Sequence, residues 1–486
     1  MKKIIETIKQ KWIKDTLATI FIIIILFLIF IGINIFIQKL DISDIDITKN
    51  QLFTLSETSK KQVKEIEEEI KIYLIGFNEN TSLIDLVKQY TKTNEKIQSE
   101  TIENITDRAD LKSKYGITDE TQVIIIETKE NSKILTIDEL YTYDYTTYQQ
   151  IDTTEEKITN AILDLTKTKR PKIYFLTGHN EYNITNGLTM LSAYLQNEIN
   201  EVETLDLLVK GNVPEDANLL VIANPEKDFM ENEVEILTTY INKGGKILWM
   251  NDPKFAENSY PNIQKILDQF GITFEEGIIL EQNENKMALQ APNYIIPEIA
   301  TTNATKDIAT DGGILFVNAT KISLKTDEEL ETLKVTPQTI LTSSETSLFR
   351  KEVNNSYPYK IASDEEGKFT LGVKLTKDIE QNEEEEPKTA TLYAISNNFF
   401  VSDYPVTIGN NSVYPITFYN NKDYILNTIA ELTENENGIS IRKDTGVVTY
   451  TVTEAQDKTI KIAITIYPIL IIIIGIIVWL YRKRKK

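Results

Sequence analysis

Cysteine is absent from the 486 residues of this chain, and histidine occurs once, as His179. Without cysteine the chain has no thiol nucleophile, no thiolate ligand for a metal ion and no disulfide. A single imidazole among scattered carboxylates lacks the ligand spacing of a metal centre. The sequence therefore predicts no metal site, and nothing in it indicates a bound cofactor.

Several motifs that mark nucleotide-binding or catalytic sites are also missing. There is no G-x-x-x-x-G-K-[ST], and Gly244-Gly245-Lys246 lacks its spacing, so the chain is not itself a P-loop ATPase. The motifs G-x-G-x-x-G, H-E-x-x-H and G-x-S-x-G do not occur either. A Ser-His-Asp triad is still compatible with the sequence, because serine is plentiful and the missing G-x-S-x-G motif is only one of the turns that present such a serine.

Charge is strongly unbalanced toward acid. The net charge is −21, although residues 1–15 and 482–486 are both basic, so the part between them is more acidic still. Such a surface repels nucleic acid and the anionic faces of membranes. We therefore expect no nucleic-acid partner and a solvated body that stands away from the lipid surface.

Long hydrophobic runs occur at both ends of the chain. Residues 16–37 and 462–481 contain no charged side chain, and each run has the ~20 residues that cross a bilayer. Lysines precede the first run and the basic residues 482–486 follow the second, which predicts that both termini are cytoplasmic and that residues 40–460 are extracytoplasmic. A cleaved signal peptide is the alternative for the first run, but the run is longer than a signal core and no Ala-x-Ala site follows it.

The extracytoplasmic part is predicted to be α/β. Apolar strand patterns at 172–177, 219–223 and 246–250 alternate with amphipathic helical patterns, which is typical of a parallel sheet with helices on its faces. Residues 391–395 form another strand pattern, with a return to the same sheet as one option. The predicted segments are a first α/β domain at 40–165, a parallel α/β domain at 166–285, a mixed α/β remainder at 286–432 and a membrane-proximal segment at 433–461.

Polar residues follow three of these predicted strands. Gly178, His179 and Glu181 follow the first, Asn224 follows the second and Asp252 follows the third. Because the carboxyl ends of parallel strands meet at one sheet edge, where ligands bind in such folds, these residues are our candidate ligand site. The alternative is ordinary turn chemistry, since Gly, Asn and Asp commonly follow strands.

Residues 141–145 place tyrosine at alternate positions. On a strand the three rings share one face. That face is either a stacking surface for sugar or a half-buried aromatic layer against a helix.

An ordered set of short segments resembles a known family. Between the two hydrophobic runs lie Thr-Lys-Asn-Gln-Leu-Phe-Thr-Leu-Ser at 48–56, Gly-His-Asn-Glu at 178–181, Ser-Asp at 402–403 and Asn-Lys-Asp-Tyr-Ile-Leu-Asn at 421–427. This order resembles the GldG-type auxiliary component of ABC transporters, named for its gliding-motility members. The family's Gly-His-x-Glu falls on Gly178, His179 and Glu181. The region 286–320 departs from the pattern, because no His-Pro-Ile element follows Tyr294.

The resemblance implies an external α/β domain similar to glutamine-amidotransferase-like, flavodoxin-like folds, and partnership with a multi-span permease and a separate cytoplasmic ATPase. The sequence-based hypothesis is thus a non-enzymatic accessory subunit that binds a substrate or a cell-envelope ligand and is held by two membrane helices. One alternative is an envelope hydrolase that uses His179 with Glu181 or Asp252. Another is an envelope scaffold without a ligand.

Overall fold

The computed structural model describes residues 54–434, apart from 78–79, 119–120, 145–148, 167–169, 199, 255–259, 307, 309–311, 352–359, 380–387 and 409–410, together with 20–21, 24–25 and 27–32. Within these residues no helix has both the length and the apolar character needed to cross a bilayer. The predicted span at 16–37 lies partly outside the described residues, and the span at 462–481 lies wholly outside them.

Residues 54–166 contain a four-stranded sheet of order β2-β1-β3-β4. Strands β1 and β2 are parallel, and β3 runs antiparallel to β1 and β4. Apolar side chains of three helices, α3, α4 and α6, share one core with the sheet. The elements are α3 (Glu57–Lys64), β1 (Ile70–Ile75), α4 (Thr81–Thr93), β2 (Ile97–Ile102), α5 (Ala109–Tyr115), β3 (Val123–Glu127), β4 (Ser132–Thr136), β5 (Tyr141–Asp144), β6 (Gln149–Asp152) and α6 (Thr154–Thr166).

The alternating tyrosines begin in β5, which pairs with β6 in a hairpin. The side chains of Tyr143 and Tyr145 lie outside the described residues, so the two interpretations of this face stay predictions.

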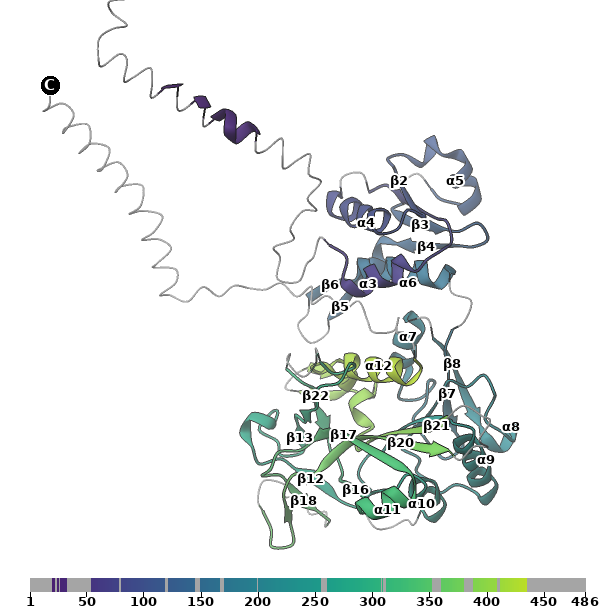
Figure 1. Ribbon diagram of the computed structural model, residues 1–486, viewed down its shortest axis with the longest axis vertical. Helices are drawn as coiled ribbons and strands as arrows, with labels where there is room; N and C mark the ends of the chain where they lie inside the picture. Colours follow the sequence, from purple (N-terminus) through teal and green to yellow (C-terminus); the bar gives the residue numbers. More distant parts are fainter. Residues whose placement is uncertain are drawn as a thin grey trace, which may run out of the picture. The chain divides into compact units, whose positions relative to one another are not determined.

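Residues 170–434 build a ten-stranded mixed sheet, labelled in Figure 1. Its main path is β11-β16-β20-β21-β10-β9-β7-β8, and β17 joins β20 and β14. The first half consists of β7 (Lys172–Thr177), α7 (Thr189–Asn197), β8 (Glu201–Asp206), α8 (Leu207–Lys210), β9 (Leu219–Ala223), α9 (Glu231–Asn242), β10 (Lys246–Met250), α10 (Pro261–Asp268), β11 (Ile272–Phe274) and β12 (Ile278–Leu280). The second half includes β13 (Tyr294–Ile295), β14 (Glu298–Ile299), β15 (Phe316–Val317), β16 (Ile322–Leu324), α11 (Asp327–Thr332), β17 (Val335–Thr342), β18 (Leu348–Arg350), β19 (Glu365–Glu366), β20 (Thr370–Ile379), β21 (Lys388–Ile395), β22 (Val406–Ile408), β23 (Asn411–Val413) and α12 (Asn421–Leu432).

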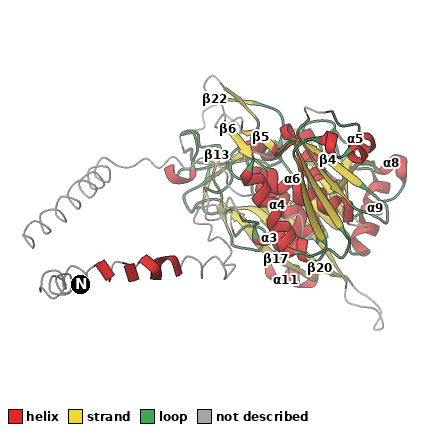
Figure 2. Cartoon of the chain, turned by 90° about the horizontal axis from the view of Figure 1, so that it is seen from above, coloured by secondary structure: helices red, strands yellow, loops and turns green. Residues whose placement is uncertain are grey.

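The two faces of this sheet bury two separate cores. Alternate residues of a strand point to opposite faces, so Phe175 of β7 packs in one core and Leu176 in the other. Apolar residues of α7 and α12 pack on the first face, and those of α9 and α10 pack on the second. Helices and strands are distinguished by colour in Figure 2. The predicted α/β fold with helices on both faces of a sheet is confirmed. The sheet is mixed, because β7, β8, β9, β10 and β21 pair in parallel, whereas β11, β14, β16, β17 and β20 join by antiparallel pairing.

The sheet contains strands from two segments, 166–285 and 286–432, that the sequence analysis predicts as separate units. Strand β21 pairs in parallel with β10, from Lys246 opposite Thr391 to Met250 opposite Ile395. The return of residues 391–395 to the same sheet is therefore confirmed, and the 286–432 segment supplies part of the sheet that carries the candidate site.

Candidate functional site

Four parallel strands end at the same edge of the large sheet. β7, β9, β10 and β21 are neighbours in that sheet and all pair in parallel. The predicted convergence of the Gly178, Asn224 and Asp252 turns is therefore confirmed, and the turn that follows β21 at 396–398 joins them. This carboxyl edge is the part of a doubly wound sheet where ligands bind.

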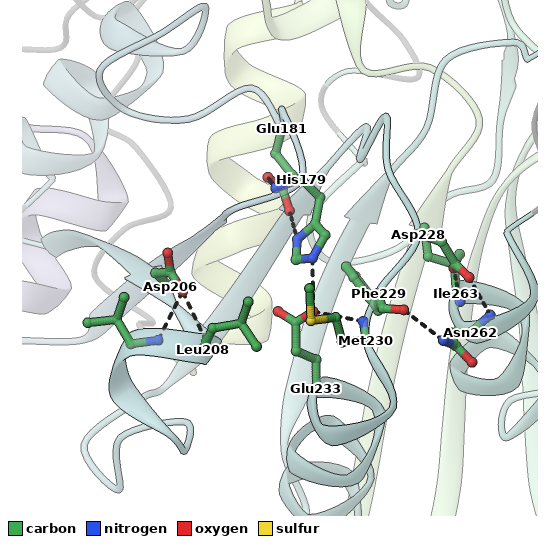
Figure 3. A network of polar contacts seen from close by, with 11 residues as sticks. His179, Glu181, Asp206, Leu208, Asp228, Phe229, Met230, Glu233, Asn262 and Ile263 are labelled. Atoms are coloured by element: carbon green, nitrogen blue, oxygen red, sulfur yellow. Dashed lines mark hydrogen bonds and ion pairs between the residues drawn. The ribbon is translucent and has the colours of Figure 1, made fainter.

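His179 links two elements at this edge through its ring (Figure 3). Its Nδ1 lies 3.0 Å from Oε1 of Glu181, and its Nε2 lies 2.9 Å from Oε2 of Glu233, which lies in the first turn of α9. The backbone N–H of His179 also donates to Glu181 Oε2 at 2.7 Å. We call Glu181, His179 and Glu233 the histidine clasp, because together they join the turn after β7 to α9.

The turn after β7 has the backbone shape that the clasp requires. Gly178 has φ +124°, a backbone conformation that residues other than glycine rarely adopt. The His179 carbonyl accepts hydrogen bonds from the N–H groups of Glu226 (2.8 Å) and Lys227 (3.2 Å), so the turn after β9 is fixed to it as well.

The three residues of the histidine clasp are buried, and their burial and mutual contacts determine the pKa of His179. His179 is 5% exposed, Glu181 2% and Glu233 0%. Burial by itself lowers the pKa of His179, but the hydrogen bonds and charges of Glu181 and Glu233 outweigh it, so the net pKa is raised above 6.5. With both ring nitrogens bound to carboxylates, the imidazole has no nitrogen left to take a proton from a nucleophile or a substrate.

Asn224 and Asp252 form a second group at the same edge. Asn224 Oδ1 accepts the N–H of Asp252 at 3.2 Å. Asp252 Oδ1 in turn accepts from Asn397 Nδ2 (3.1 Å) and from the N–H groups of Asn398 (2.7 Å) and Phe399 (2.9 Å). Asp252 thus fixes the turn after β21, and no hydrogen bond among the described residues links it to His179.

The electrostatics around Asp252 oppose charge. Burial raises the pKa of Asp252 to about 6, against the opposite effect of the Phe399 and Asn398 N–H groups and of Lys254. Burial likewise lowers the pKa of Lys254 to about 8, although nearby carboxylates, Glu226 first among them, favour its charged form. The Lys254 ammonium donates to the Pro225 carbonyl and lies 4.2 Å from the centre of the Tyr260 ring.

The helices that begin at this edge have their first N–H groups bound by the chain's own carboxylates. This holds for α7, α8 and α10, whereas at α9 the bound N–H is that of Met230, the residue before the helix. At α7, Asp403 accepts the backbone N–H of Thr189 (2.7 Å), and at α8, Asp206 accepts that of Leu208 (2.9 Å). At α9, Glu233 accepts the backbone N–H of Met230 (2.9 Å), and at α10, Asp228 accepts that of Ile263 (2.9 Å). Helix N-termini are where such folds bind phosphate and other anions. Carboxylates already occupy such donors at α7, α8 and α10, so these three helix starts disfavour an anionic ligand.

One of these caps corrects a sequence-based assignment. The sequence Asp228-x-x-Glu231 has the spacing of a capping box, which predicts that Asp228 caps a helix carrying Val234, Leu237, Tyr240 and Ile241. Instead, Met230 and Glu233 provide the cap of α9, and Asp228 caps α10 by accepting from Asn262 and Ile263. The capping-box spacing gave the wrong helix because the Asp228 carboxylate binds the N–H of Asn262, which lies 34 residues further along the chain.

The cap of α7 comes from Asp403, in the Ser402-Asp403 segment. Asp403 accepts hydrogen bonds from both the N–H and the hydroxyl of Thr189, and from Met190 N at 3.3 Å. We predict that Asp403→Ala lowers the free energy of unfolding by about 1–2 kcal/mol, because α7 loses its cap. Urea unfolding measures this, and Asp138→Ala, at an exposed position, is the control, with an expected change below about 0.5 kcal/mol. Equal effects of the two substitutions would contradict the assignment.

The structure assembles all five predicted site residues at one edge, but in two groups. Gly178, His179 and Glu181 lie in the turn after β7, and Asn224 and Asp252 form the other group. Sequence reasoning missed Glu233, whose only signal is its position three residues after the helix cap. In the part of the chain that the structure describes, no group of histidine and acidic side chains has the arrangement of a metal site.

Comparison with known proteins identifies the class. The family described as "ABC-type uncharacterized transport system" matches residues 170–428, more than half of the chain. The chain therefore belongs to this family, and it is an auxiliary component of an ABC-type transport system. The matched range contains the large sheet and both groups of the candidate site. No curated protein matches the chain.

Among solved structures, the chain is similar to the N-terminal domain of mmIFT52 and to two ThuA-like proteins. The mmIFT52 domain has a TM-score of 0.37 and 15% identity, over 54% of this chain and 97% of that one. The ThuA-like protein from Bacteroides uniformis has a TM-score of 0.28 and 11% identity, and the match covers 48% of this chain and 84% of that protein. The ThuA-like protein from Parabacteroides merdae has a TM-score of 0.26 and 11% identity, and the match covers 47% of this chain and 79% of that protein. These values concern the fold alone.

Proposed function

We propose that this chain is a non-enzymatic subunit of its transport system that binds a substrate or a partner, of the GldG type. Its α/β body would be extracytoplasmic, and the two hydrophobic segments 16–37 and 462–481 would cross the membrane and pack on the permease. The observation that supports this most is the family match over residues 170–428. The flanking uncharged runs and their basic ends favour the same arrangement.

The geometry of the edge favours binding over catalysis. A general base needs a free nitrogen or oxygen within hydrogen-bond reach of the proton that it takes. His179 has both ring nitrogens bound to buried carboxylates. Asp252, the other acid invoked for a hydrolase, accepts three hydrogen bonds from the turn after β21 at its Oδ1, and no hydrogen bond among the described residues links it to His179. Both groups hold loops in place, which suits a preformed surface.

Purification from membranes tests the proposal. A tagged full-length chain, extracted in a mild detergent, is expected to bring down a multi-span permease and a cytoplasmic ATPase. A matched variant truncated after residue 461 lacks the second hydrophobic run and is expected to lose most of both partners. Recovery of the full-length chain alone would contradict the proposal, and equal recovery of partners by the truncated chain would contradict the role of the second run.

A further inference from the structure

The turn after β7 crosses the point where the connections of the large sheet diverge. Helix α7, which follows β7, packs on one face of the sheet, and α9, which follows β9, packs on the other. Doubly wound sheets bind ligands in the crevice at such a point. In this chain the turn is bonded across it, because the Tyr182 N–H donates to the carbonyl of Ala223 in β9 at 3.0 Å.

The ring of His179 ties this turn to α9, as the dashed lines in Figure 3 show. Its Nε2 contacts Glu233 Oε2, the same oxygen that accepts the backbone N–H of Met230. The other oxygen of Glu233, Oε1, is buried and has no hydrogen-bond partner among the described residues. The tie therefore consists of one ring nitrogen and one carboxylate oxygen.

The proton on His179 determines whether both sides of the histidine clasp attract each other. A protonated imidazole donates from both nitrogens, to Glu181 at Nδ1 and to Glu233 at Nε2. A neutral imidazole donates from one nitrogen only, so the other nitrogen presents a lone pair to a carboxylate oxygen. Loss of the proton thus makes one of the two contacts repulsive and leaves two buried carboxylates without the positive charge between them.

Acidic groups approach the ring from three elements. Glu181 contacts it from the turn after β7, and Glu233 contacts it from α9. At the end of β8, Asp206 Oδ2 lies 4.0 Å from the point that a Cβ on the glycine before His179 would occupy. The neighbouring Phe229 ring packs edge to face at 4.9 Å between centroids, and it carries no charge. The imidazolium is therefore the positive centre of a buried acidic group.

Lys254, in the turn after β10, does not replace that centre. Glu181 is among the carboxylates that favour its charge, but Glu226 and Asp252 have larger effects. Its ammonium also donates to the carbonyl of Pro225. The lysine is thus already committed to the turn after β9 and offsets the charge of the clasp only in part.

We propose that the histidine clasp is a proton-operated lock on the turn after β7. With His179 charged, the turn is fixed across the crevice; with His179 neutral, the turn is released while the strands beneath it stay folded. All the residues of the lock lie within 170–434, so it does not depend on the proposed membrane arrangement. In an extracytoplasmic body the lock would make this edge respond to the pH outside the cell.

Hydrogen–deuterium exchange of the purified full-length chain tests the lock. Exchange is followed from about pH 5.5 to about pH 9, with labelling times scaled to the intrinsic exchange rate at each pH. Because the pKa of His179 is raised above 6.5, protection is kept at the acidic end and lost as pH rises through that raised value. We expect protection of a peptide covering 178–182 to fall about tenfold, and that of β10, at 246–250, to stay constant.

Two variants assign the change to His179. His179→Gln cannot titrate, so the pH dependence of the 178–182 peptide is expected to disappear. Glu233→Gln removes a charge that raises the pKa of His179 but keeps an oxygen for the Met230 N–H, so the change is expected at lower pH. Asp252→Asn is the matched control, because burial raises the pKa of Asp252 to about 6, and it is expected to leave the change where it is.

Three results would overturn the lock. They are constant protection of the 178–182 peptide in the unaltered chain, the same change in His179→Gln, and an unshifted change in Glu233→Gln. If His179→Gln does not fold, the shift in Glu233→Gln decides the matter. None of these results touches the proposed function, since recovery of the permease and the ATPase is measured separately.

Discussion

His179→Gln is expected to lower the free energy of unfolding by about 3–5 kcal/mol, because removal of one partner from a buried charged cluster leaves the others uncompensated. Glu181 and Glu233 have completely buried side chains, and His179 is the group that lies between them. Glutamine at this position cannot become positively charged. Chemical denaturation of the purified protein measures the loss.

The double variant His179→Gln, Glu233→Gln separates the electrostatic cause from a packing cause. It removes one of the two stranded carboxylates, so we expect it to be more stable than His179→Gln alone. Equal or lower stability of the double variant would show that lost packing, and not uncompensated charge, determines the cost.

The pH dependence of the clasp follows from the raised pKa of His179. A histidine whose pKa is higher in the folded state stabilises the fold fully below its unfolded pKa of about 6.5, and this contribution is lost as pH rises through the folded value. The difference in stability between the unaltered chain and His179→Gln is therefore expected to be largest on the acidic side and to shrink as pH increases. Because the chain has a single histidine, an NMR titration of its imidazole needs no assignment, and a pKa below 6.5 would contradict the clasp.

Asn421→Ala is expected to lower the free energy of unfolding by about 3 kcal/mol. The fully buried side chain of Asn421 donates to the carbonyls of Leu315 (2.9 Å), Phe400 (3.1 Å) and Pro415 (2.9 Å), and it accepts the Leu315 N–H at 2.8 Å. Alanine leaves these backbone groups buried without a partner, and each such group costs about 1–3 kcal/mol.

Asn427→Ala, in the same helix α12, is the matched control. Asn427 is half-buried, and its amide donates to the Ala304 carbonyl at 3.0 Å. We expect a clearly smaller loss, about 1 kcal/mol, in the same denaturation experiment. Similar losses for the two substitutions would mean that Asn421 does not join its three segments as the structure indicates.

Strong local patterns allowed the centre of the fold to be predicted. Strands β7, β9 and β10 are buried on both faces, so their sequences are nearly continuous apolar runs followed by turn residues. Once the strands are parallel, the meeting of their carboxyl ends follows from geometry, which is why His179 and Asp252 were placed at one edge correctly. β8 was missed because it is an edge strand whose mostly exposed residues lack an apolar run.

Contacts between distant residues could not be predicted in this way. Glu233 reaches His179 across 54 positions, and Asp403 reaches Thr189 across 214. The sequence near either acid does not point to its distant partner, since that partner is brought close only by the finished sheet. Of the two acids that the hydrolase alternative names beside His179, Glu181 contacts its ring, whereas Asp252 binds the turn after β21 instead.

Membrane topology tests the proposed arrangement most directly. In whole cells, Leu289→Cys in the otherwise cysteine-free chain is treated with a membrane-impermeant maleimide, and a second chain has its only cysteine appended after Lys486. An extracytoplasmic body with cytoplasmic termini predicts labelling at position 289 in intact cells and labelling of the appended cysteine only after permeabilisation. Labelling of the appended cysteine in intact cells, or protection of position 289 until the membrane is opened, would contradict the proposal that this auxiliary component works outside the cytoplasm.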